Sequence, residues 1–238
     1  MSRHPRCFPD VFRICILMTA LLALGCATHV NDILSEAKKG DPESVKEAVV
    51  ELGVALQEKE ASGFPYDAAD EEAVLYLKDV ASKSSDHLNR ASALSSLALL
   101  KRPDITSVFV GALDDRSWIV QMEAAKGLEA RPDPRAAEPL ARRLAVEERM
   151  EVRLAIIKAL AATGGDESLR ALLSAFLDRS NRWKTMRLIT YDAVRALSGK
   201  EIRMENEDAW QAYFAERFPG RTIVPETIPP GGFAPKGE

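Results

Sequence analysis

The sequence predicts an all-α fold, a right-handed α-solenoid of stacked helical hairpins. Alanine, leucine, glutamate and basic residues are abundant, whereas aromatic residues make up 6% of the chain and runs of Val, Ile, Thr and Tyr are scarce. Similar stretches also recur at spacings of 31 to 33 residues, which is typical of repeat proteins. With 46% hydrophobic residues in 238, the chain is long enough for one substantial core.

Two series of similar residues share this period. The first consists of RASALSSL at 90–97, VQMEAAKGL at 120–128 and VRLAIIKAL at 152–160. The second runs through the other half of each unit, as Phe109, Leu140 and Leu173. Because both series place apolar residues at i, i+3, i+4, i+7 and i+8, each period is interpreted as two amphipathic helices.

Short polar breaks separate the helices. They read RPD at 102–104, RPDP at 131–134 and GGD at 164–166, so the expected N-cap residues are Asp104, Asp133 and Asp166. Pro139 does not suit a helix interior, so its helix should begin late or kink there. A single hairpin cannot bury both of its apolar stripes, and stacking on its neighbours solves this problem.

The pattern of valine, arginine, alanine and alanine-leucine followed by a Gly/Pro-Asp turn resembles HEAT-like repeats of the phycobilisome-lyase type. The resemblance covers residues 85–200, about four repeats. Gln121 departs from the usual arginine, and the fourth repeat carries about five extra residues around 181–185. The resemblance implies an architecture rather than one function, because this repeat family serves many roles.

Additional helices are expected to cap both ends of the stack. Within 26–84, residues 30–60 and 70–82 are expected to form an N-terminal capping hairpin around a loop at 63–67. Residues 201–218 are expected to form a C-terminal capping helix, with Trp210 packing on the last repeat. Its leucine-x-glycine-lysine and tryptophan pattern resembles the ending of HEAT-like repeats in bacterial envelope proteins. The Pro- and Gly-rich residues 219–238 predict a disordered tail.

The first 25 residues have the features of a signal peptide. Three arginines precede eleven uncharged residues at 14–24, too few to span a bilayer. The segment ends ALGC, which resembles the lipobox of bacterial lipoproteins. That resemblance implies cleavage before Cys26 and acylation of its thiol, and Ala27 favours an outer-membrane protein facing the periplasm. The alternative is an ordinary signal peptide in which Cys26 is incidental.

Removing residues 1–25 would also remove the other cysteines, Cys7 and Cys15. It would take the formal net charge from −4 to −6, because the segment carries three arginines and one aspartate. A mildly acidic chain without a basic cluster argues against nucleic acid as a partner. Membrane attachment is therefore expected to come from the lipid.

The histidines, glycine pairs and acidic pairs of the chain show no catalytic pattern. His4, His29 and His87 lack metal-ligand spacing, and Gly164-Gly165 is a helix stop rather than a phosphate loop. The acidic pairs Asp114-Asp115 and Glu147-Glu148 precede second helices, where negative charge caps a helix start. We expect no enzyme, no metal site and no cofactor.

Two tryptophans are the best candidates for binding a partner. Trp118 and Trp183 follow similar stretches in their units, and arginines lie near them. Tryptophan and arginine are enriched in binding hot spots. The candidate partner-binding residues are Trp118, Arg149, Arg153, Trp183 and Arg187. The alternative is that both tryptophans pack between neighbouring repeats.

These observations predict a membrane-anchored lipoprotein whose HEAT-like solenoid acts as a non-enzymatic scaffold or adaptor. Its partner would be another envelope protein. The alternative hypothesis is a cofactor or bilin lyase-like factor, or another ligand-binding HEAT-repeat factor, which the repeat resemblance implies.

Overall fold

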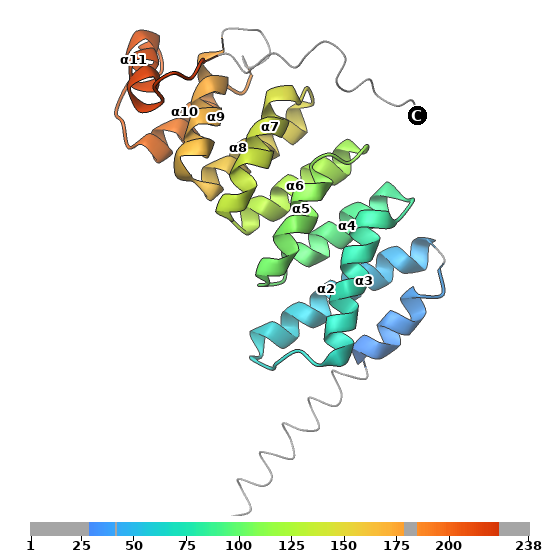
Figure 1. Cartoon of the computed structure of the whole chain (residues 1–238). Helices are drawn as coiled ribbons and strands as arrows, with labels where there is room; N and C mark the ends of the chain where they lie inside the picture. The colour runs from blue at the N-terminus through green and yellow to red at the C-terminus, as the bar shows by residue number, and fades with distance from the viewer. Residues whose placement is uncertain (1–28, 41, 179–184, 224–238) are drawn as a thin grey trace, which may run out of the picture. The chain divides into compact units, whose positions relative to one another are not determined.

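The computed structural model describes residues 29–40, 42–178 and 185–223. Within these ranges all regular secondary structure is helical, and the predicted all-α solenoid of stacked hairpins is confirmed (Figure 1). The predicted signal segment, Cys26, Trp183 and residues 224–238 lie outside the described residues. The chain divides into two compact units, 1–101 and 102–238.

The first unit contains a helical segment at 29–37 followed by α2 (Pro42–Ala61), α3 (Ala68–Lys83) and α4 (His87–Ala98). Helix α4 packs against both α2 and α3. The predicted loop at 63–67 is confirmed. The stretch expected to be helical over 30–60 is divided into two helical segments at Gly40, whose positive φ of 92° does not fit a right-handed helix.

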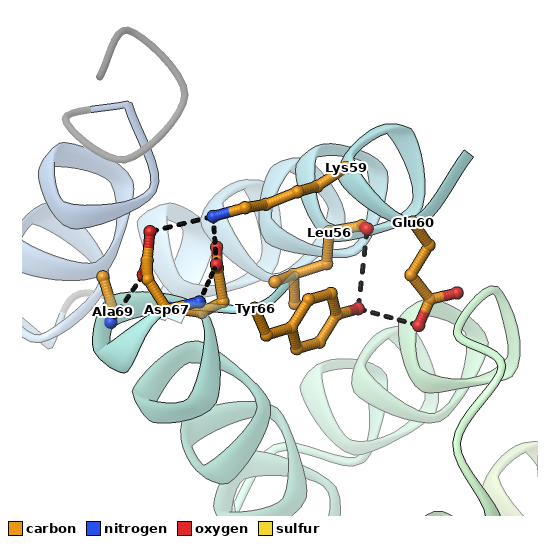
Figure 2. A network of polar contacts seen from close by, with 7 residues as sticks. Leu56, Lys59, Glu60, Tyr66, Asp67 and Ala69 are labelled. Carbon is orange, nitrogen blue, oxygen red and sulfur yellow. Dashed lines mark hydrogen bonds and ion pairs between the residues drawn. The ribbon is translucent and has the colours of Figure 1, made fainter. Parts of the chain in front are cut away.

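A buried ion pair joins α2 to the start of α3 (Figure 2). Lys59 is only 6% exposed, and its Nζ donates to Asp67 Oδ2 at 2.8 Å and to Asp70. Asp67 caps α3 by accepting from the N–H of Ala69 and of Asp70. Burial alone would lower the pKa of Lys59, but its hydrogen bonds to the two aspartates outweigh burial and raise it.

A second polar link holds the same corner of the first unit. The Tyr66 hydroxyl donates to Glu60 Oε1 at 2.9 Å, and Glu60 Oε2 accepts from the Lys101 N–H at 2.9 Å. The loop between α2 and α3 and the chain after α4 are thereby tied to one carboxylate.

Among its described residues, the second unit contains three helical hairpins and a final helix. The hairpins are α5 (Thr106–Ala112) with α6 (Trp118–Ala130), α7 (Ala137–Val146) with α8 (Met150–Thr163), and α9 (Gly165–Leu177) with α10 (Arg187–Ser198). Short 3₁₀ turns, η1 (Pro103–Ile105) and η2 (Pro134–Ala136), precede α5 and α7. The second helices pack in the order α6, α8, α10, and the first helix α7 packs on α9.

The helix starts follow the sequence prediction in part. Asp133 is an N-cap residue, and its side chain accepts from the Arg135 N–H at 2.9 Å. The predictions for Asp104 and Asp166 are wrong. Asp104 lies inside η1 and pairs with Arg102, while Asp166 lies inside α9, whose N-cap is Gly164. Gly164 has a φ of 69°, so this glycine sets where the helix begins.

Two further predictions about helix ends are confirmed. Helix α7 begins at Ala137, so Pro139 lies in the first turn, where a missing N–H costs no intrahelical bond. The predicted C-terminal cap is α11 (Glu207–Arg217), which packs on α9. Trp210 is fully buried there, with its ring centroid 5.9 Å from that of Phe176 and 6.1 Å from that of Tyr191.

One glycine permits the close approach of α5 and α6. A Cβ atom built on Gly127 in α6 would lie 2.3 Å from Cε1 of the Phe109 ring in α5. Phe109 is itself fully buried, so its ring has no free space into which to move. The absence of a side chain at position 127 is therefore a packing requirement of this hairpin.

We predict that Gly127→Ala destabilises the chain by about 1–3 kcal/mol, because the added methyl overlaps a buried ring. The matched control is Gly111→Ala in α5, where an added Cβ meets no atom within 4 Å. This control should be neutral or more stable by about 0.5–1 kcal/mol, the usual helical advantage of alanine. Urea unfolding followed by circular dichroism measures both. Equal midpoints for the two variants would contradict the packing argument.

Candidate interaction surface

A recurring buried side chain fixes the loop before each of three second helices. The position seven residues before the recurring leucine holds Arg90, Gln121 or Arg153, and all three side chains are buried. Each donates to the backbone carbonyl six residues earlier in the chain: Arg90 to Ser84 at 2.8 Å, Gln121 to Asp115, and Arg153 to Glu147 at 2.8 Å. The side chain therefore closes the loop onto its own helix, and Gln121 replaces arginine in the same role.

The structure places Arg153 inside this arrangement. It is 7% exposed, and its guanidinium is turned toward the loop carbonyl of Glu147. In the fourth repeat the equivalent residue is Thr190, whose hydroxyl donates to the Met186 carbonyl of its own helix at 2.8 Å. The geometry gives Arg153 a structural role, and it presents little surface to a partner.

Glu147 is the centre of a polar network between repeats. This buried carboxylate accepts from the N–H of Glu148 at 2.8 Å and of Arg149 at 2.7 Å. It also accepts from Arg143 Nε at 3.1 Å, and Arg143 Nη2 donates to Gln121 Oε1 at 2.9 Å. The network links the end of α7 to α6 in the preceding hairpin.

Burial alone would raise the pKa of Glu147. The N–H of Arg149 and the guanidinium of Arg143 outweigh burial, so the pKa of this carboxyl lies below its usual value. The acidic pairs were expected to cap the second helices. Asp115 and Glu147 instead accept from the N–H of the N-cap residues Ser117 and Arg149, so they orient the chain just before each helix.

Two of the predicted binding residues lie together. Trp118 begins α6 and is partly exposed, and Arg149 precedes α8 and is exposed. The guanidinium carbon of Arg149 lies 5.3 Å from the centroid of the Trp118 ring, a cation–π geometry. Because Glu147 holds the Arg149 N–H, the pair is attached to a fixed loop.

Arg187 has other contacts. It pairs with Glu207 of α11, and its guanidinium carbon lies 4.9 Å from the centroid of the Phe176 ring in α9. It thereby joins the last hairpin to the C-terminal cap. Trp183 lies outside the described residues. The structure thus unites Trp118 with Arg149, and partner binding by the five residues stays a prediction.

Two exposed apolar residues were not among the binding residues predicted from the sequence. Met150 at the start of α8 is 51% exposed, and Leu188 at the start of α10 is 59% exposed. The repeat register could have found both. Met150 precedes Leu160 by ten residues, as Trp118 precedes Leu128. Leu188 precedes Leu197 by nine residues, as Ile119 precedes Leu128. We call Trp118, Arg149, Met150 and Leu188 the second-helix ridge.

The described part of the chain contains no group of three or more His, Cys, Asp and Glu residues placed to hold a metal ion. None of the helices in these ranges has both the length and the apolar character to cross a membrane.

Comparison with known protein families supports the repeats. Residues 74–149 match the family model of HEAT repeats. The matched region runs from within α3 through α7 to the residue before α8, so the chain contains HEAT-like repeats. No curated protein matches the chain.

We predict that Glu147→Gln lowers stability at pH 7 by about 1–3 kcal/mol, the usual worth of hydrogen bonds to a charged group. The pKa of Glu147 is lowered from 4.5 on folding. Its charge therefore stabilises the fold above about pH 4.5, and this contribution is lost as pH falls through the folded pKa. The difference between wild type and variant should shrink at pH 3.

Urea unfolding at pH 7 and pH 3 measures this effect. The control is Glu148→Gln, which changes the exposed neighbour and should stay within about 0.5 kcal/mol of wild type. If the loss in Glu147→Gln were the same at both pH values, the carboxylate charge would not be its cause.

Proposed function

We propose that this chain is a lipid-anchored, non-enzymatic scaffold of the bacterial cell envelope that binds another envelope protein. The observation that carries the proposal is the second-helix ridge. Three successive second helices each carry, as their first or second residue, a large apolar side chain that is at least partly exposed, namely Trp118, Met150 and Leu188. Large apolar side chains that remain exposed at the starts of successive packed helices favour a protein-binding surface.

The chemistry of the ridge supports a protein partner. Tryptophan, methionine and arginine are the residue types enriched in protein interfaces. The Arg149 backbone is bound by Glu147, which Arg143 links to Gln121. A surface held in place before binding loses little conformational entropy when a partner arrives, so it binds more tightly than a loose one.

The anchor is supported by the N-terminal sequence. The lipobox-like ending before Cys26 favours acylation of that thiol, and two or three acyl chains hold a protein stably at a membrane. Ala27 after the cysteine favours the outer membrane, with the repeats facing the periplasm. The lipid would keep the ridge near its partner and raise its local concentration.

The anchor predicts that Cys26→Ser abolishes labelling by an alkyne fatty acid fed to cells that express the chain. The protein should then move from the membrane fraction to the soluble fraction. Cys7→Ser and Cys15→Ser are matched controls, because both cysteines precede the expected cleavage site and should leave the label unchanged. Labelling that survives in Cys26→Ser would reject the lipoprotein proposal without touching the proposal about the ridge.

The ridge is tested with the photo-crosslinking residue benzoylphenylalanine at Met150 or Leu188 in intact cells. Both positions should give an adduct with the same envelope protein, and Trp118→Ala should reduce its yield severalfold. The control position is Lys158, which is exposed later in α8. An adduct of equal yield from Lys158, or none from either ridge position, would contradict binding at the ridge.

A further inference from the structure

The first helices of the second unit border a groove that the ridge does not use. Its volume is about 1100 Å³, and it is lined by α5, α7 and α9 together with residues 220–222. Small side chains line much of it: Ala137, Ala141, Ala145, Ala171 and Ala175. Because α7 offers alanines and Pro139 here, neighbouring side chains do not fill the space.

A polar group in the wall of this groove has no partner. Ser174 of α9 lines the groove and is 7% exposed, and its Oγ makes no hydrogen bond within the described residues. A buried hydroxyl without a partner is costly, so an acceptor at this position would stabilise the folded chain.

Charge does not select the occupant of the groove. Arg142 and Arg221 line it, but so do the carboxylates of Asp114 and Glu138. The groove therefore carries both signs and attracts neither a strongly acidic nor a strongly basic partner.

Chain connectivity does favour an occupant. After α11 the chain runs along the groove at Gly220, Arg221 and Thr222, and residues 224–238 follow directly. These residues begin VPETIPP, in which Val224 and Ile228 are apolar and three of the seven residues are prolines. Proline lacks an N–H, so such a segment has few donors to satisfy, while its carbonyls are free to accept from a hydroxyl such as that of Ser174.

Length and tethering also fit. Helix α7 has ten residues and is about 15 Å long, whereas a polyproline-type segment rises about 3.1 Å per residue. About five residues of the segment would thus cover α7. A short tether gives an effective concentration of about a millimolar, so even weak contacts suffice.

We propose that residues 224–230 dock in the groove between α5, α7 and α9 of the same chain, with a backbone carbonyl accepting from the Ser174 hydroxyl. This contact goes beyond the scaffold function and does not depend on it. It would replace the disorder expected for the first part of the tail.

Disulfide trapping in the full chain tests the proposal. Ala141→Cys in the groove is combined with Ile228→Cys, and oxidation is followed by gel mobility and peptide mass analysis. The matched control combines Lys158→Cys, exposed on α8, with the same Ile228→Cys. The groove pair should form an intramolecular disulfide about tenfold faster than the control pair, because docking raises the local concentration of the thiol.

A second variant checks the site itself. Ala145→Trp, added to the chain that carries Ala141→Cys and Ile228→Cys, fills the groove and should slow disulfide formation. Circular dichroism checks that this variant keeps the helical fold. Equal rates for the groove and control pairs would overturn the proposal. Disulfides that form between two chains instead would assign the groove to the tail of a second copy and would also overturn it.

Discussion

The second unit depends on one repeated hydrogen bond, from a buried side chain to the loop carbonyl six residues earlier. Gln121 and Arg153 make it in successive hairpins, and Arg90 makes it in the first unit. Each loop must turn the chain from a first helix into a second helix and leaves backbone carbonyls facing the interior. A buried polar group without a partner costs about 1–3 kcal/mol, so the side chain that satisfies the carbonyl sets the loop geometry.

The same bond explains why this position accepts glutamine. A guanidinium and a carboxamide both present an N–H donor at the end of an extended side chain. Gln121 also has an acceptor, which receives a hydrogen bond from Arg143 of the next hairpin. The departure from the repeat pattern thus adds a link between hairpins that an arginine, which has no acceptor, could not make. Glu147 binds the same Arg143, so one guanidinium joins the two loops.

The sequence predicted the parts of the fold that rest on local periodicity. The apolar spacing at 152–160 and around Phe109 and Leu173 predicted helices. Trp210 was correctly placed on the last repeat, because such a large apolar side chain needs a buried site. The cap at Asp166 was wrong, since the positive φ of Gly164 decides where α9 begins. A residue's cap position depends on backbone angles that composition alone does not specify.

The candidate site was predicted less completely, for a related reason. Arg153 was expected at the surface because arginines usually are, but its partner is a carbonyl in the preceding loop, and no sequence pattern identifies such an acceptor. Met150 and Leu188 were missed because hydrophobic residues at helical spacing are normally assigned to the core. Only the register against Trp118 and Ile119 separates them from core positions, since these equivalents precede the buried stripe of their helix.

The hydrogen bonds that close the loop before α8 and the second-helix ridge are physically connected. The loop that Arg153 and Glu147 close is the loop that carries Arg149 and leads into Met150, so these two exposed residues stand on a hydrogen-bonded backbone. In a solenoid each hairpin contacts only its neighbours, and the spacing between exposed residues on successive helices is therefore set by these local links. A partner that contacts the starts of several second helices would need contact points that match that spacing. A substitution that loosens one loop would then weaken binding without removing any residue that contacts the partner. The loop would lose conformational entropy when the partner binds, and this loss would reduce the binding free energy.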